Sequence, residues 1–257
     1  MKKFVFAAAA LAALTFTSCK KDDDKNPGGG GSVPPPSKLL KKVTQVEDGV
    51  TTIYTLTYDA NKRLTAYKSN DNTEQVLFTY DNDGNITKVE QQDAEFKNIY
   101  TYSYTAGVPV TGTLKSWQKH AGEPDELIED DILTYTVANQ QVTNIHLNMT
   151  MDGEEADFKM SYTNGNLSKV EIPGSDLYTA TFVYGTRRSP FPQLSKYVLD
   201  QAGFSLQFSA KNELLSATYD FPNTTLDKTI TNTYTYDADG YALTSNDGET
   251  QLKFEYQ

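Results

Sequence analysis

Apolar and polar side chains alternate over short stretches through most of the chain, from residue 38 to residue 257. In EQVLFTYDNDGNITKVE, residues 74–90, Val76, Phe78 and Tyr80 fall on one face of an extended strand, and the residues between them fall on the other. A turn follows, because Asp and Asn side chains bond their own backbone and Gly accepts a positive φ. Alternation then resumes, so the stretch predicts a β-hairpin.

The same form recurs along the chain, with an aromatic residue near the end of the strand that precedes each turn. Its markers are Tyr58, Tyr80, Tyr104, Tyr135, Tyr162, Tyr184, Phe208, Tyr236 and Tyr256. They lie at intervals of about 20 to 30 residues, which is typical of a repeat architecture. About eight hairpins make more strands than an open sheet usually holds, and curling removes exposed edges. We therefore expect one all-β domain over residues 38–257, a large antiparallel meander of repeated β-hairpins curled into a barrel or half-barrel, and soluble.

Three details refine this prediction. Gly84 and Gly240 occupy equivalent places in their turns, so we expect positive φ there, whereas Lys62 holds that place in its own turn and departs from the pattern. The stretch Phe208–Asp220 predicts a further, weaker hairpin. The segment Glu123–Asp131 is the only candidate for a helix, and we interpret it as an acidic loop.

The chain before residue 38 has a different pattern. Lys2 and Lys3 precede an apolar run from Phe4 to Phe16, and the single cysteine, Cys19, follows two small residues. The run suits the apolar core of a signal peptide and is shorter than the ~20 residues that a membrane-spanning helix needs. Residues 20–37 are rich in charge, Gly and Pro, a composition that predicts an unstructured tether.

A cysteine at the end of such a run resembles the lipobox of bacterial lipoproteins, although Phe16 stands where that pattern prefers Leu. The resemblance implies a lipoprotein signal peptide over residues 1–18, and acyl chains, palmitate among them, on Cys19. Residues 19–37 are then the lipidated cysteine and its disordered tether. The alternative is an ordinary signal peptide with an incidental free thiol, which exported proteins rarely leave exposed.

Lys21, Asp22 and Asp23 follow the cysteine in an order that resembles the surface-export signal of Bacteroidota lipoproteins. This resemblance implies a protein anchored by lipid to the outer membrane and facing the cell exterior. The alternative is a solvated tether in which any charges would serve.

The repeat itself also carries a resemblance. Tyr58-Asp59, Tyr80-Asp81 and Tyr236-Asp237 resemble the YD repeats of Rhs and teneurin shells, without the Arg that is common there. The domain as a whole, including VYGTRRSPFPQL at residues 183–194, is similar to a family of uncharacterised Bacteroidota lipoproteins, a domain of unknown function described as porin-like. That similarity implies a barrel or half-barrel and no known activity. Charged residues recur too often along the strands for a lipid-facing wall, so we expect a body in water rather than a membrane pore.

Composition narrows the possible partners. The chain has 23 Lys and Arg against 34 Asp and Glu, a net charge of −11, which repels phosphate backbones and argues against nucleic-acid binding. With one cysteine the domain has no internal disulfide, so it must bury a core, which 17 Tyr and 12 Phe can supply.

Candidate chemistry is sparse. The sequence contains two histidines, His120, which we place in a loop, and His146, which the alternation places on a solvent face, and it has no familiar catalytic or nucleotide-binding motif. Asp81 and Asp83 begin like a calcium loop, but Ile86 stands where that loop requires Gly, so the turn interpretation is favoured. We expect no catalytic residue, no metal site and no cofactor.

Trp117, the single tryptophan, is a candidate ligand contact that could stack on a sugar or anchor a partner, although its alternating neighbours also suit a packing role. The sequence favours a binding or structural module for a glycan or a partner protein, and not an enzyme. The alternative is a hydrolase acting on polysaccharide, which would need two converging carboxylates in a cleft.

Overall fold

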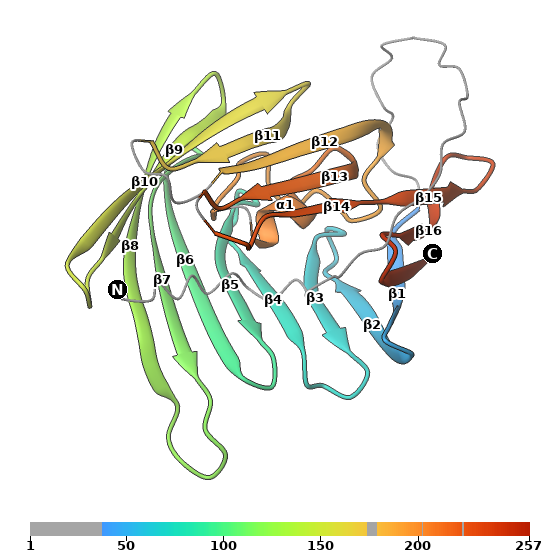
Figure 1. Ribbon diagram of the computed structural model, residues 1–257, viewed down its shortest axis with the longest axis horizontal. Helices are drawn as coiled ribbons and strands as arrows, with labels where there is room; N and C mark the ends of the chain where they lie inside the picture. The colour runs from blue at the N-terminus through green and yellow to red at the C-terminus, as the bar shows by residue number, and fades with distance from the viewer. Residues whose placement is uncertain (1–37, 174–178, 202, 223) are drawn as a thin grey trace.

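The computed structural model describes residues 38–173, 179–201, 203–222 and 224–257. These residues form seventeen strands and one five-residue helix (Figure 1). The strands are β1 (Leu40–Glu47), β2 (Val50–Tyr58), β3 (Leu64–Ser69), β4 (Gln75–Tyr80), β5 (Ile86–Gln92), β6 (Phe96–Thr105), β7 (Val108–Gln118), β8 (Glu126–Ala138), β9 (Gln141–Met149), β10 (Glu154–Thr163), β11 (Asn166–Glu171), β12 (Thr179–Arg188), β13 (Asn212–Asp220), β14 (Lys228–Thr231), β15 (Thr233–Tyr236), β16 (Ala242–Asn246) and β17 (Thr250–Tyr256). The helix is α1 (Phe204–Phe208), between β12 and β13. The predicted all-β fold is confirmed.

The strands form an antiparallel meander that closes on itself. Each strand pairs with the next from β1 to β14 and from β15 to β17, and β1 also pairs with β17. Only Asn232 separates β14 from β15, so these two elements are halves of one bent strand, the first paired with β13 and the second with β16. The wall is therefore a nearly closed barrel rather than a half-barrel.

The barrel has two different ends. The Tyr-Asp end is the end with the turns that join β2 to β3, β4 to β5 and β15 to β16. At this end Leu39, before β1, and Gln257, after β17, share backbone hydrogen bonds of 2.9 and 3.1 Å. The far end carries the turns that join β1 to β2, β3 to β4, β5 to β6 and β16 to β17.

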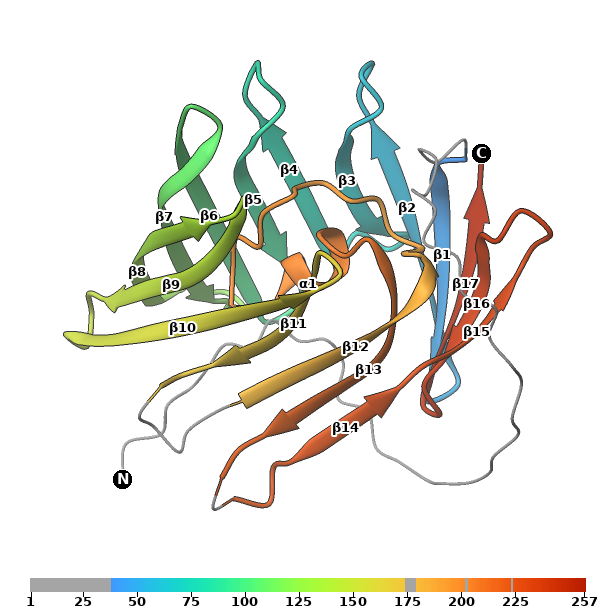
Figure 2. The same ribbon diagram turned by 90° about the horizontal axis from the view of Figure 1, so that it is seen from above.

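A plug segment, residues 189–201 and 203–211, enters the barrel from the Tyr-Asp end between β12 and β13. Figure 2 shows α1 of this segment enclosed by the curving wall. Phe208 of α1 is almost fully buried and meets Phe78 of the wall edge to face, with ring centroids 5.3 Å apart. Tyr135 of β8 donates a hydrogen bond of 2.7 Å to the carbonyl oxygen of Leu199, which ties the plug segment to the opposite wall. The protein core is thus the plug packed against the inward side chains of the strands.

The repeated tyrosines join neighbouring hairpins. Tyr80, at the end of β4, donates a hydrogen bond of 2.7 Å to the carbonyl oxygen of Leu64, the first residue of β3. The equivalent bonds run from Tyr58 to Leu40, Tyr104 to Ile86, Tyr162 to Val142, Tyr234 to Leu214 and Tyr256 to Ala242. Each of these six tyrosines therefore contributes a partly buried ring packed against the core and a polar link to the neighbouring hairpin.

The repeated aspartates shape the turns. The side chain of Asp81 accepts a hydrogen bond of 2.8 Å from the backbone N–H of Asn85, and the Asp59 and Asp237 side chains accept the matching bonds in their own turns at 2.9 Å. Gly84 has φ of 87° and Gly240 of 82°, so the predicted positive φ is confirmed at both.

Lys62 adopts the same geometry, with φ of 60°, and this corrects the expectation that its turn departs from the pattern. The hydrogen bonds that the Asp59 side chain accepts from Asn61 and Arg63 hold this turn in place without a glycine.

Two further expectations are corrected. Glu126 to Asp131, expected to lie in an acidic loop, form the start of β8, because Glu129 and Asp131 alternate inward with the outward Asp130 and pair with β7. Phe208, expected to mark a strand, lies in α1, and the strand of that stretch begins at Asn212.

The outer face of the wall carries many polar side chains, with single exposed apolar residues such as Ile132 and Val183 among them. Threonine pairs lie across neighbouring strands, such as Thr101 with Thr113 at 2.7 Å and Thr235 with Thr244 at 2.6 Å. Within the described ranges, no helix is both long and apolar enough to cross a membrane.

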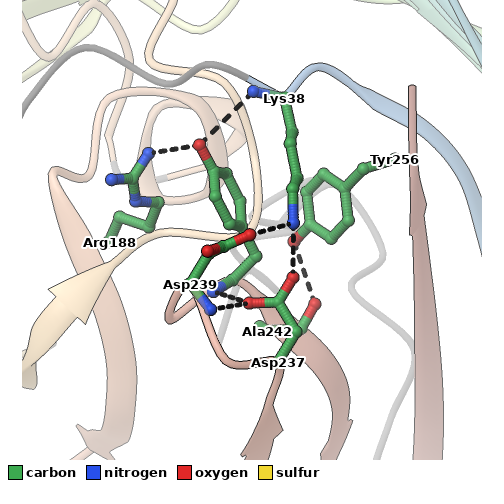
Figure 3. Close-up of polar contacts among 7 residues, drawn as sticks. Lys38, Arg188, Asp237, Asp239, Ala242 and Tyr256 are labelled. Carbon is green, nitrogen blue, oxygen red and sulfur yellow. Dashed lines mark hydrogen bonds and ion pairs between the residues drawn. The ribbon is translucent and has the colours of Figure 1, made fainter.

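Lys38 fixes the first described residues to the closing seam of the barrel, as Figure 3 shows. Its ammonium group lies 2.8 Å from the Asp237 carboxylate and 2.7 Å from that of Asp239, and both carboxylates raise the pKa of Lys38. Tyr241 accepts a hydrogen bond from the Lys38 backbone at 3.3 Å, and the Arg188 guanidinium donates to its hydroxyl at 2.9 Å. The chain that precedes residue 38 therefore joins the barrel at the Tyr-Asp end.

Candidate functional site

A cavity of about 690 Å³ lies inside the barrel, between the plug segment and two parts of the wall. Strands β1 to β5 supply one side, strands β13 to β17 supply the other, and α1 supplies part of the floor.

Aromatic rings form the deep part of the cavity. Tyr54 and Tyr67 from β2 and β3 stack in parallel with ring centroids 4.7 Å apart. Phe191 and Phe208 of the plug segment pack edge to face at 5.6 Å, and Phe254 of β17 meets Phe191 at 5.8 Å. These rings come from both walls and the plug, and they offer apolar faces to any occupant.

Acidic side chains line the cavity toward the far end. They are Glu47, Asp48, Glu74, Asp93 and Asp247. Each lies in or beside a far-end turn. None of the described residues that line the cavity is a lysine or an arginine.

The mouth of the cavity lies at the far end. Asp48 and Glu74 are exposed, and Val50, which also lines the cavity, is 66% exposed. The site therefore has an apolar floor against the plug and an acidic opening on the side of the barrel that is remote from Lys38.

Two polar atoms on the cavity lining are buried and have no hydrogen-bond partner among the described residues. They are Oε1 of Gln91 on β5 and Oγ1 of Thr250 on β17. Thr250 is only 9% exposed. Buried polar atoms normally have a hydrogen-bond partner, so a ligand in the cavity would supply the partner that each of these atoms lacks.

The mouth also holds bonded polar groups. Glu47 lies directly opposite Thr250 in the pairing of β1 with β17, and its carboxylate accepts a hydrogen bond of 2.8 Å from the Gln45 amide. Next to Glu47 on the same wall, at β2, the Tyr54 hydroxyl donates a hydrogen bond of 2.6 Å to Glu74, and burial together with this acceptor raises the pKa of Tyr54.

A second group of inward carboxylates lies outside the cavity lining. Burial raises the pKa of Asp131 on β8 to about 7, and the charge of Glu129 adds to the effect. Burial likewise raises the pKa of Asp200 in the plug segment to about 6, although it accepts hydrogen bonds from Ser205. Ser116 contacts Asn98 and Glu129 at 2.8 and 2.7 Å. In the part of the chain that the structure describes, no group of three or more acidic, His or Cys residues could hold a metal ion.

The residues singled out from the sequence are not brought together. Cys19, Lys21, Asp22 and Asp23 lie outside the described residues. Trp117 lies on β7 with its ring under the Lys97 ammonium, 5.3 Å from the centroid, and it does not line the cavity.

The two histidines face solvent or loops as expected. His146 lies on β9 between the outward carboxylates of Glu155 and Asp157, and its side chain is 37% exposed. His120 follows β7 in the turn before β8, 3.3 Å from Glu126.

Sequence reasoning missed the cavity, because its described residues come from ten strands and from a plug that the repeat pattern did not separate from a hairpin. The sequence contains a partial indication of the acidic end of the cavity. Glu47 and Asp247 each continue the inward alternation of a strand up to its turn, where an acidic residue replaces the expected apolar one.

Comparisons with known proteins give the fold alone. No protein-family model matches the chain, and no curated protein matches it. Among solved structures, it is similar to a porin-like protein from Bacteroides uniformis ATCC 8492, with 16% identity and a TM-score of 0.50 over 86% of this chain and 99% of that one. It is also similar to a porin-like protein from Bacteroides vulgatus ATCC 8482, with 12% identity, a TM-score of 0.54 and the same coverage. The barrel that the porin-like resemblance implied is confirmed.

Proposed function

We propose that the protein is a lipoprotein, anchored to the outer membrane by acyl chains on Cys19, whose barrel is a binding module for a small ligand. Lys21, Asp22 and Asp23 would carry it to the outer surface of the cell. The polar outer face, with its threonine pairs and its ion pairs such as Lys88 with Glu90 at 2.9 Å, supports a body in water that hangs from the anchor.

The cavity carries this proposal. Its volume of about 690 Å³ falls within the ~300–1,000 Å³ of known small-molecule sites, which are also concave, mostly apolar and supplied with a few polar groups. A structural protein whose interior served only stability would gain by filling this space, since empty volume costs packing energy.

The position of the mouth fits such a role. The tether joins the barrel through Lys38 at the Tyr-Asp end, and the mouth lies at the far end. An anchored protein of this form presents its mouth away from the membrane, toward ligands in the medium.

A glycan fragment fits this site better than a partner protein does. Aromatic faces such as Tyr54 and Tyr67 can stack on sugar rings, and the Gln45 and Gln91 amides can bond hydroxyl groups. A protein partner needs a broad surface rather than a concave cavity.

We propose binding without catalysis. Five carboxylates line the cavity, which keeps a polysaccharide hydrolase as the alternative. Release of reducing ends from a soluble polysaccharide by the wild-type protein, abolished by Glu47→Gln or Asp247→Asn, would establish that alternative.

The anchor is tested by Cys19→Ala. We expect this variant to lose acylation and to move from the detergent phase to the aqueous phase in phase partitioning. Replacement of Lys21, Asp22 and Asp23 by alanine tests the export signal separately. That variant should keep its acyl chains but lose its accessibility to protease on whole cells. A Cys19→Ala protein that stays in the detergent phase would refute the anchor.

Binding is tested by filling the cavity. Ala217 lines the cavity from β13, and Thr218 beside it faces outward against Thr229. Ala217→Phe should abolish binding of ring compounds and sugar oligomers measured by calorimetry on the mature chain with Cys19→Ala, and Thr218→Phe should not. Ser245→Phe, on β16 of the same wall, gives a second filled variant if the first folds poorly. Binding that survives both filled variants would refute the cavity as the site.

A further inference from the structure

Aspartates lie in the turns at both ends of the barrel, whereas arginines gather at one end and lysines such as Lys119 and Lys228 lie at the other. The cationic groups Arg63, Arg187 and Arg188 lie at the Tyr-Asp end, where they cover the rings of Tyr80, Tyr236 and Tyr241 at 4.7, 4.4 and 4.3 Å. The far-end turns carry the aspartates Asp48, Asp71, Asp93, Asp125, Asp152, Asp227 and Asp247. The described residues that line the cavity nevertheless include five carboxylates and no lysine or arginine, so the lining itself is acidic.

Within the mouth, carboxylates lack a cationic partner on the lining. Glu47 accepts one hydrogen bond from the neutral Gln45 amide, and the Asp247 side chain accepts hydrogen bonds from the backbone N–H groups of Glu249 and Thr250. Neutral donors leave the negative charge of each group uncompensated, so the field in the mouth attracts a cation.

The unpartnered atoms add a second, independent observation. Gln91 Oε1 is an acceptor only, and it therefore requires an N–H or O–H from an occupant. Thr250 Oγ1 lies opposite Glu47 in the strand pairing, so a donor group held by Glu47 would also reach the threonine hydroxyl. An ammonium group has three donors and suits the carboxylate and the hydroxyl that β1 and β17 place together. Gln91 lies on β5, four strands from β1, and can accept a hydrogen bond from another polar group of the ligand.

We propose that the cavity binds a ligand that joins a ring to a protonated amine, with the ring against Tyr54 and Phe208 and the amine at Glu47 and Asp247. This inference rests on the proposed binding function and adds the charge of the ligand. Two sources share this chemistry, an arylalkylamine and an amino sugar, and the experiment separates them.

The test uses three compounds of one shape on the mature chain with Cys19→Ala. They are 1-naphthylmethylamine, which is protonated at neutral pH, 1-naphthylmethanol, which is neutral, and 1-naphthoate, which is an anion. A second pair, glucosamine tetramer and N-acetylglucosamine tetramer, compares a cationic sugar with a neutral one. We expect the amine of at least one pair to bind about tenfold or more tightly than its neutral counterpart, and the anion to bind weakest.

The variants locate the charge. Glu47→Gln combined with Asp247→Asn should reduce affinity for the amine to that for the neutral compound and leave the neutral compound unaffected. The matched control is Asp83→Asn combined with Asp220→Asn, which removes the same charge from exposed positions that do not line the cavity. Added sodium chloride should weaken amine binding to the wild type and leave the alcohol unchanged, which tests the charge without any variant.

The outcomes are distinct. Equal binding of amine, alcohol and anion overturns the charge inference, while loss of that binding in Ala217→Phe still supports the binding module. An amine preference that falls equally in the control pair also overturns the inference, because net charge alone would then explain it. Binding of no compound by the wild type overturns the inference as well, and the cavity-filling experiment with other sugars decides separately on the binding module.

Discussion

The hydroxyl of Tyr80 lies 2.7 Å from the carbonyl oxygen of Leu64, and this hydrogen bond links one hairpin of the barrel to the hairpin before it. The ring that carries the hydroxyl also packs against the core. The repeated tyrosine is thus both a core residue and the polar link between repeats, which explains its recurrence without any catalytic role.

Removal of that hydroxyl should destabilise the barrel. We expect Tyr80→Phe to lower the free energy of unfolding by about 1 kcal/mol, since the Leu64 carbonyl loses its donor. Tyr102→Phe is the matched control, because the buried Tyr102 hydroxyl has no hydrogen-bond partner among the described residues, and its removal should be neutral or stabilising. Urea titration measures both, and an equal loss in the two variants would contradict the assigned role of the hydroxyl.

Substitutions at equivalent positions of two Tyr-Asp turns should change the free energy of unfolding in opposite directions. Lys62 has φ of 60° and Gly84 has φ of 87°. Lys62→Gly should raise the free energy of unfolding by about 0.5 kcal/mol, because relief of left-handed strain exceeds the added freedom of the unfolded chain. Gly84→Val should lower it by about 1 to 2 kcal/mol, and Gly84→Asn by less, since Asn tolerates this conformation.

Space does not explain the expected loss at Gly84. A Cβ there would meet only the Arg63 guanidinium at an ordinary 3.9 Å, so backbone strain is the remaining cause. Thermal melts in which Gly84→Asn and Gly84→Val are equally stable would show that the turn places no demand on φ at this position.

The plug segment should contribute strongly to stability. Phe208 is 1% exposed and contacts Phe78 and Phe191 edge to face. We expect Phe208→Ala to cost about 3 to 5 kcal/mol, the usual cost of a large cavity in a core. Leu226→Ala, at a position that is 65% exposed, should change the free energy of unfolding by less than about 0.5 kcal/mol. A loss at Phe208 no larger than that at Leu226 would mean that the plug is loosely held.

Asp131 predicts a dependence of stability on pH. Its pKa in the folded protein is raised to about 7 from an ordinary 3.8, so between these values the folded state holds a proton that the unfolded state has released. Stability from this group therefore falls as pH rises from about 4 to about 7, by on the order of 4 kcal/mol.

Asp131→Asn should remove this loss. We expect the variant and the wild type to have similar free energies of unfolding at pH 4, and the variant to be the more stable at pH 8. Asp83→Asn, at an exposed turn position, is the control and should show no such trend. An Asp131→Asn protein whose stability relative to wild type is the same at both pH values would contradict the burial of an ionised carboxylate.

Much of the fold could be predicted from the sequence, because strand alternation and turn chemistry are local. The inward face of Val76, Phe78 and Tyr80 and the positive φ of Gly84 both follow from a few neighbouring residues, and the structure confirms them. The expectation of a curled sheet followed from the number of hairpins.

The plug and the cavity could not be predicted in the same way, since they depend on contacts between distant segments. Phe208 continues an alternating stretch in sequence, yet it packs as part of a helix because Phe78 and Phe191 surround it in three dimensions. Glu126 to Asp131 have the composition of a loop, but pairing with β7 makes them a strand. Trp117 was a candidate ligand contact because it is the single tryptophan. It lies on the outer face under the Lys97 ammonium, where it packs outside the cavity.

The central claim is that the cavity inside the barrel is the ligand site. A crystal structure of the mature chain with the tightest ligand of the amine and sugar series tests it most directly. The account predicts the ring of the ligand between Tyr54 and Phe208 and its amine beside Glu47. A ligand found on the outer face beside Trp117, with the cavity unoccupied, would contradict it.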